Sequence, residues 1–242
     1  MKTTFTILAS ILTLVVIGQD TTYHDHDGNK VVSFQLCHYY SVIERNSADT
    51  NKVVERAYFK SGQIKSERYY HPYSKKHLDG NSKEWYESGQ IRRDINHEDG
   101  SLNGELRTYW EDGQLKRHDT YESGKLIKGK VLGAQGNEVE YYDFEMMPQF
   151  PGGEKALFQF LSKNITYPEK SKRRGVEGLV YVNFTIEKDG SISNINVLQG
   201  VSEEIDAEAV LVVSTMPKWN PAKYDGEKVS VSYNLPLKFT IN

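Results

Sequence analysis

The sequence predicts an α+β protein in which an antiparallel sheet of repeated β-hairpins precedes a small α+β domain with a three-stranded antiparallel sheet. Two observations carry this prediction. A phrase of aromatic residues, a glycine and an aliphatic residue recurs in the first part of the chain, as in "EWYESGQIRR" at 84–93. From about residue 154 the phrase stops, and stretches of helical spacing alternate with stretches of period two.

The composition favours sheets and excludes some classes of partner. The 242 residues include 16 Tyr, 9 Phe and 3 Trp, which suit a half-buried pleated surface. Lys and Arg number 30 against 33 Asp and Glu, so the net charge of −3 gives no field for a nucleic acid. With one cysteine, the fold cannot rely on an internal disulfide.

The first residues, 1–18, read as an export signal. The apolar run from Phe5 to Ile17 would span roughly 20 Å as a helix, less than the ~30 Å hydrocarbon core of a bilayer. We therefore expect a cleaved secretory signal and a periplasmic or cell-envelope location. The alternative is an uncleaved anchor in the inner membrane.

The repeated phrase predicts hairpins. Ser-Gly and Asp-Gly supply the positive φ that two-residue hairpin turns need, and aliphatic and charged residues alternate in the return strands. The first three marked glycines are 27 and 24 residues apart, a spacing at which each unit buries its apolar face against its neighbours. The marked glycines are Gly62, Gly89, Gly113 and Gly124.

The stretches "YFKSGQI", "WYESGQI" and "YWEDGQL" resemble the bacterial MORN-type repeat, a hairpin unit rich in glycine and aromatic residues. The resemblance covers roughly Val53 to Val139. It implies a scaffold, and the alternative is a dedicated binding face for a protein or a lipid.

The second half predicts helices and strands in alternation. Apolar residues recur at helical spacing over 154–164, and Ser202 can cap a later helix that Pro217 ends. "KDGS" at 188–191 joins two predicted strands, and the chain finishes on a long alternating strand. The predicted elements are helices at 154–164, 168–174 and 203–216 and strands at 179–187, 192–199 and 229–241.

These residues resemble the C-terminal domain of TonB, the periplasmic energy transducer. "YPEKSKRRGVEGLVYVNFTIEKDGSISNINVL" from Tyr167 and "AVLVVSTMPKWNPAKYDGEKVSVSYNLPLKF" from Ala209 carry the resemblance, which extends from about Phe150 to Asn242. It implies that an extended peptide, the TonB box of an outer-membrane transporter, binds as an added strand beside the final strand. Energy-dependent transport across the outer membrane would follow.

The final strand is predicted to be a sheet edge, independently of this resemblance. Pro236 lies inside it, and proline cannot donate to a ladder. An open edge is a template for strand addition, unless a loop or a dimer partner covers it. The predicted peptide-binding residues are Ser230, Val231, Ser232, Tyr233, Asn234 and Leu235.

The sequence departs from an energy transducer of this family in one respect, which leaves a second function open. An energy transducer needs an uncleaved N-terminal helix that meets an inner-membrane motor, and then a long Pro-rich spacer. Here hairpin repeats occupy the place of the spacer. The alternative is an envelope scaffold or interaction protein without energy coupling, whose partner is another envelope protein.

No enzyme, metal or cofactor is predicted. His24 and His26 in "YHDHD" would share one face of a strand, but they follow the cleavage region, where chain ends are usually mobile. No Ser/His/Asp or Cys/His constellation has usable spacing. The expected domain map is a signal peptide at 1–18, a repeat region at 19–147, a linker at 148–153 and a TonB-like domain at 154–242.

Overall fold

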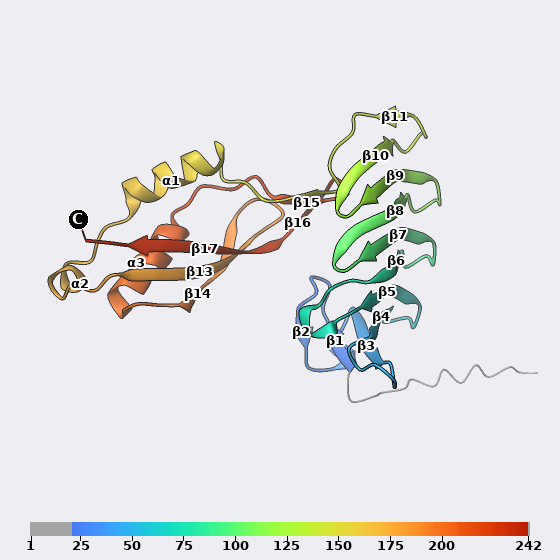
Figure 1. Cartoon of the computed structure of the whole chain (residues 1–242), viewed down its shortest axis with the longest axis horizontal. Coiled ribbons are helices and arrows are strands. Elements are labelled where there is room, and N and C mark those ends of the chain that lie inside the picture. Colours follow the sequence, from blue (N-terminus) through green and yellow to red (C-terminus); the bar gives the residue numbers. More distant parts are fainter. Residues whose placement is uncertain (1–20, 242) are drawn as a thin grey trace, which may run out of the picture. The chain divides into compact units, whose positions relative to one another are not determined.

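The computed structural model describes residues 21–241 and forms two compact units, one ending at Tyr141 and the other beginning at Tyr142 (Figure 1). The predicted signal peptide at 1–18 lies outside the described residues. Within residues 21–241 no helix has the length and apolar character needed to cross a membrane. The predicted fold class is confirmed, since a hairpin sheet precedes a small α+β unit with a three-stranded sheet.

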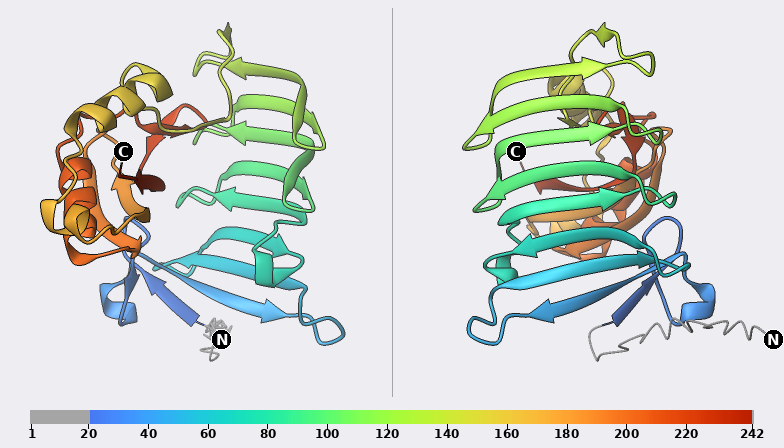
Figure 2. Two further views of the ribbon diagram at one scale, coloured as in Figure 1. Left: turned by 60° about the vertical axis from the view of Figure 1, so that its left-hand side comes forward. Right: turned by 90° about the vertical axis from the view of Figure 1, so that its right-hand side faces the viewer.

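The first unit is one antiparallel sheet of 11 strands, in which strands close in sequence lie beside one another (Figure 2). Its spatial order is β11-β10-β9-β8-β7-β6-β5-β4-β3-β1-β2. The strands are β1 (Thr21–His24), β2 (Lys30–Val31), β3 (Tyr39–Arg45), β4 (Val53–Phe59), β5 (Ile64–Tyr70), β6 (Gly80–Trp85), β7 (Ile91–Glu98), β8 (Ser101–Tyr109), β9 (Leu115–Glu122), β10 (Lys125–Leu132) and β11 (Glu138–Val139). Two short 3-10 helices interrupt them, η1 (Phe34–Leu36) and η2 (Tyr73–Lys75).

The first three copies of the phrase make the same turn. In the second copy the N–H of Tyr86 donates to the carbonyl of Gln90 at 2.9 Å, and the N–H of Gly89 donates to that of Tyr86 at 2.9 Å. The same two bonds recur where Phe59 and Trp110 hold the aromatic position. The positive φ is confirmed, at +86° for Gly89.

The expected loop length was wrong for these three copies, because three residues separate the bonded pair and the glycine is the bulge residue. The fourth, looser copy does form a two-residue turn. Its Ser123 and Gly124 have φ of +48° and +79°, and Glu122 pairs with Lys125 across them.

One face of the repeat sheet carries a row of alternating charges. The register places Arg56 opposite Glu67, and the ion pair between Arg56 Nε and Glu67 Oε2 measures 2.6 Å. Ion pairs that keep contact with solvent contribute little each, but a register slip of one residue would move the whole row to the other face. The row is Arg56, Glu67, Lys83, Asp94 and Arg107 on β4 to β8.

The other face holds charged residues that are partly shielded from water. Glu84 on β6 lies between Arg68 and Arg93, with N–O distances of 2.6 and 2.5 Å. Burial would raise the pKa of the Glu84 carboxyl, but the charges of Arg93 and Arg68 outweigh it and lower the pKa to about 2. The carboxylate therefore stays ionised and links three strands.

Strand β9 of the repeat sheet carries a buried ion pair. Arg117 and Asp119 on β9 are fully buried and meet at 2.7 Å. Tyr141, which follows β11, donates its hydroxyl to Asp119 at 3.2 Å, and the Arg117 guanidinium lies 5.3 Å from its ring centroid. Gly129 faces this pair from β10, where a Cβ would overlap both Tyr141 and Asp119. A glycine at that position is therefore a packing requirement.

The second unit contains two three-stranded antiparallel sheets and three helices (Figure 1). The strand orders are β14-β13-β17 and β12-β15-β16. Ser202 caps α3 as predicted, since its side chain accepts from the N–H of Ile205. The elements are β12 (Glu145–Met146), α1 (Gly153–Asn164), α2 (Glu169–Arg173), β13 (Gly178–Ile186), β14 (Ile192–Gln199), α3 (Glu203–Ser214), β15 (Ala222–Tyr224), β16 (Glu227–Val229) and β17 (Val231–Phe239).

Residues 148–153, where the sequence predicts a linker, pack within the second unit. Gln149 and Asn220 exchange backbone hydrogen bonds of 3.0 and 2.8 Å. Phe150 is buried in the core, with its ring centroid 5.5 Å from that of Trp219. The segment that precedes α1 therefore belongs to the core it was expected to lead into, while the proposed domain boundaries stay a prediction.

The "KDGS" turn and "KWNPA" touch each other. Trp219 donates its backbone N–H to the carbonyl of Gly190 at 2.8 Å, and a Cβ on Gly190 would overlap the Trp219 carbonyl oxygen. Lys218 Nζ lies 2.5 Å from Asp189 Oδ2, and this hydrogen bond lowers the pKa of the Asp189 carboxyl. The turn thereby fixes the segment that leads from α3 toward β15 and β17.

Replacing Gly89 with valine tests the turn assignment. Nothing lies within 4 Å of a Cβ built there, so the substitution adds only backbone strain at positive φ. We expect Gly89→Val to lower the free energy of unfolding by more than ~1 kcal/mol in urea. The neighbouring Ser88→Val, at an exposed position, should cost less than about 0.5 kcal/mol. Equal midpoints for the two variants would remove the assignment.

Replacing Gly190 with alanine tests the contact with Trp219. Gly190→Ala adds both strain at a φ of +85° and an overlap with backbone that cannot rotate away. Gly175→Ala is the matched control, since its φ is +64° and its Cβ would meet nothing. In urea unfolding we expect the control to lose about 1 kcal/mol and Gly190→Ala a further ~1–3 kcal/mol. A Gly190→Ala loss no greater than that of the control contradicts the contact.

Candidate functional site: the open edge of β17

β17 is an edge strand, as Pro236 predicted. In the β14-β13-β17 sheet it has β13 on one side, and no strand of residues 21–241 pairs with its other side. The pairing with β13 runs from Gly178 opposite Phe239 to Ile186 opposite Val231 without a register shift. A row of backbone N–H and C=O groups, which lacks only the N–H of Pro236, is therefore left open along the strand.

Pro236 indicates which residues direct their backbone groups outward. It lies opposite Tyr181, and a residue without an N–H fits a ladder when its nitrogen faces away from the partner strand. Alternate residues of an antiparallel strand face the same way, so Ser232, Asn234 and Lys238 direct their N–H groups to the open side. Their side chains are exposed, whereas Leu235 and Leu237 are buried.

The solvent face of the sheet is polar beside this edge. Asn183 on β13 donates from Nδ2 to Ser232 Oγ and to Asn234 Oδ1, both at 2.7 Å. Its own Oδ1 accepts from Asn196 of β14 at 3.3 Å. One amide thus connects the three strands and holds the two edge side chains against the sheet.

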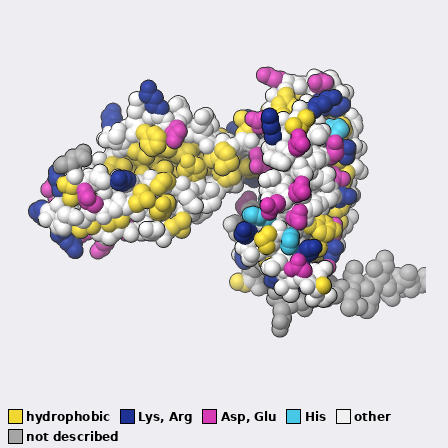
Figure 3. All heavy atoms as spheres, in the orientation of Figure 1, with side chains coloured by type: hydrophobic (Ala, Val, Ile, Leu, Met, Phe, Trp, Pro, Cys, Tyr) yellow, Lys and Arg dark blue, Asp and Glu magenta, His cyan; other side chains and the backbone are white. Residues whose placement is uncertain are grey.

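The opposite face of β17 is apolar. The Tyr233 ring lies 5.1 Å from that of Trp219 and 5.6 Å from that of Phe184. Leu157 of α1 and Leu235 of β17 belong to the same core cluster. Figure 3 shows hydrophobic side chains gathered over the region of α1 and β17 on the face in view. A strand added to this edge would have a polar surface on one side and an apolar one on the other.

Most of the predicted peptide-binding residues lie on this edge strand, at Val231–Leu235. Ser230 does not, because it lies between β16 and β17 where the chain changes sheet. Its hydroxyl donates to Glu187 at 2.7 Å. Hydrogen bonds from Ser193 and, to a smaller extent, from Ser230 lower the pKa of the Glu187 carboxyl.

The predicted single strand at 229–241 is divided in the structure, so that prediction was wrong. Val229 pairs with Ala222 of β15, whereas Val231 pairs with Ile186 of β13. Asp225 and Gly226, with φ of +52° and +81°, form the two-residue turn of a hairpin that the sequence reading missed. Asp-Gly was the signal that could have identified it.

The other sheet edges in residues 21–241 are short or irregular. β2, β11 and β12 have two residues each and β16 has three. β14 is longer, but it carries two register shifts, and Asn194 has a φ of +52°. Bulges of this kind distort an edge and discourage pairing. β17 is the longest regular edge of the described chain.

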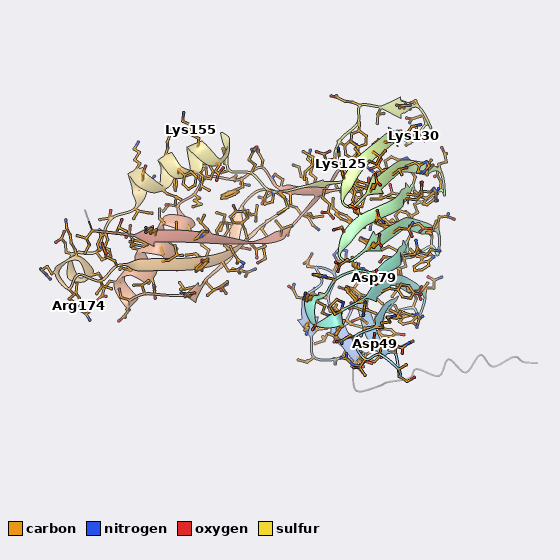
Figure 4. The ribbon with its side chains drawn as sticks, in the orientation of Figure 1. Asp49, Asp79, Lys125, Lys130, Lys155 and Arg174 are labelled. Carbon is orange, nitrogen blue, oxygen red and sulfur yellow. The ribbon has the colours of Figure 1, made fainter. Side chains whose placement is uncertain are left out.

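A second surface feature lies in the repeat unit. A hollow of about 450 Å³ is lined by residues of β3 to β5 and of the segments that flank them, among them Arg45, Tyr70 and His71. His71 lies 3.5 Å from Asp49 and 3.7 Å from Asp79, which Figure 4 labels. No group of three or more His, Cys, Asp or Glu side chains in residues 21–241 could hold a metal ion. His24 stacks on Tyr39 and contacts Ser41 Oγ at 3.2 Å.

Two solved structures and two family models are similar to parts of this chain. Two NMR solution structures of the Helicobacter pylori TonB C-terminal domain, residues 179–285 and 194–285, are 24% identical to this chain. The matches cover 36% of this chain and 78% and 90% of those chains, with TM-scores of 0.29. No curated protein matches the chain.

Two family models match within the chain, and both describe non-enzymatic interaction domains. The MORN repeat variant matches residues 78–99 and 102–123, which include β7, β9 and the turn at Gly113. The other family model covers most of the second unit, including the edge strand β17. Residues 163–241 of this chain match the family of the Gram-negative bacterial TonB protein C-terminal.

Proposed function

We propose that the second unit binds an extended peptide, of the TonB-box type found in outer-membrane transporters, by adding it as a strand to the open edge of β17. Under this proposal the N-terminal segment exports the protein to the periplasm, where it takes part in energy-dependent transport across the outer membrane. The repeat sheet serves as a stiff scaffold for the binding unit.

The regular open edge of β17 carries this proposal. Main-chain hydrogen bonds supply affinity in strand addition, and the faces beside the edge supply specificity. Ser232 and Asn234 offer the outward donors, and their side chains are already held by Asn183. A peptide strand would find an ordered edge, so little conformational entropy is lost on the protein side.

A second candidate is an envelope scaffold without energy coupling. The observation that favours it is the repeat sheet, which extends to β11 and is followed directly by the second unit at Tyr142. A transducer would be expected to have a long Pro-rich spacer here. In this reading the edge still binds a peptide, but no inner-membrane motor is a partner.

Mass spectrometry of the mature N-terminus from isolated envelopes separates the two candidates. A cleaved signal predicts a mature start near Gln19 or Asp20 and favours the scaffold. An intact segment at 1–18 in the inner-membrane fraction favours the transducer. The measurement leaves peptide binding itself open, which needs its own test.

Proline at position 232 tests strand addition. Ser232→Pro removes an outward N–H without removing a bond to β13, so the unit should stay folded while peptide affinity falls at least tenfold. Ser232→Ala keeps the N–H and should lose much less. Affinity is measured by fluorescence anisotropy of labelled TonB-box peptides with the full chain, and folding by circular dichroism.

Hydrogen exchange on the full chain locates the same contact without a substitution. Bound peptide should slow exchange in residues 231–235. Protection confined to α3 or to the turn at 188–191, with β17 unchanged, would contradict strand addition at this edge. If no TonB-box peptide binds, the scaffold candidate with a different partner remains.

A further inference from the structure

Pro236 interrupts the open edge of β17 near its middle. The outward positions are Ser232, Asn234, Pro236 and Lys238, and only the proline lacks an N–H. Adjacent outward donors on a strand lie roughly 7 Å apart, but the gap from Asn234 to Lys238 is about 13 Å. The donors therefore fall into two groups that one regular partner strand cannot use equally.

A partner strand that runs past Pro236 would meet two penalties. The partner carbonyl opposite the proline would find no donor, and it would be shielded from water by the strand it had joined. The proline ring also occupies the space of the missing hydrogen. Before Pro236 neither penalty applies, since Ser232 and Asn234 both keep their N–H groups.

The two segments of the edge also differ in their surroundings. Ser232 and Asn234 are held by Asn183, so the segment before the proline has a fixed polar side. Its apolar side is formed by Tyr233 against Trp219. Beyond the proline the next residue with an outward N–H is Lys238, whose side chain is exposed. Lysine is a residue type that protects sheet edges from pairing.

We propose that Pro236 ends the strand-addition site, so that the bound segment is short and pairs only with Val231–Leu235. This inference rests on the proposed function and deepens it. The partner is an extended peptide of about four or five paired residues, with apolar side chains on the Tyr233 side and small or polar ones beside Ser232 and Asn234. Past that point the peptide leaves the edge.

The test places the same substitution on each side of Pro236. In the full chain, Asn234→Pro and Lys238→Pro each remove one outward N–H. Fluorescein-labelled TonB-box peptides of outer-membrane transporters are titrated by anisotropy. We expect Asn234→Pro to weaken binding at least tenfold and Lys238→Pro to change it less than twofold. Equal losses in two folded variants would overturn the inference but leave strand addition standing.

Pro236→Ala supplies the converse test, since it restores the missing donor. Peptides long enough to continue past position 236 should bind at least threefold tighter to this variant, and peptides of five residues should bind as to the wild type. Unchanged affinity for every length contradicts the inference, even where Asn234→Pro fails to fold. Absence of binding to the wild-type chain overturns the proposed function and the inference together.

Discussion

The sheets of both units depend on a turn that only glycine makes without strain. In each of these turns the N–H of the residue before the loop donates to the carbonyl of the residue after it. The N–H of the glycine donates to the carbonyl of the residue before the loop. The bonds at Glu187 and Ser191 in the second unit repeat those at Phe59 and Gln63 in the first, all at 2.8 Å. The turn fixes the register, and the register sets which side chains meet across the strands. The glycines with this bond pattern are Gly28, Gly62, Gly89, Gly113, Gly136 and Gly190.

Sheets built in this way leave edges, and the two units treat them differently. The repeat sheet ends in β2 and β11, which have two residues each. The second unit distorts β14 with bulges but leaves β17 regular along its pairing with β13. An open regular edge is a hazard unless it has a use. The contrast between β14 and β17 within one small sheet therefore supports a binding role for β17.

Much of this arrangement could be predicted from local sequence. Period-two alternation identified the strands, Ser202 identified the start of α3, and Pro236 identified the edge. Each of these signals acts over a few residues. The division of the final strand at Ser230 was not predicted, because the alternation continues through it. Only the partner strand changes there, from β15 to β13.

The buried interactions could not be predicted in the same way. Arg117 and Asp119 are only two residues apart, but their burial depends on Tyr141 and on the bare backbone of Gly129. Similarly, the packing of Phe150 depends on Trp219, far along the chain. A strand pattern says which residues share a face but not which segment covers it. Register and coverage are properties of the folded chain.

The composition of the β17 edge suits a strand that accepts one partner and refuses others. Two copies of β17 pairing antiparallel would each bring a proline without a donor into the shared ladder, and Lys238 would add an unpaired charge at each end. A long ladder between two copies is therefore disfavoured, whereas a short peptide can stop before the proline. The residues that shorten the usable edge also guard the sheet against pairing with itself, so the limit on the partner and the protection against association have the same physical cause.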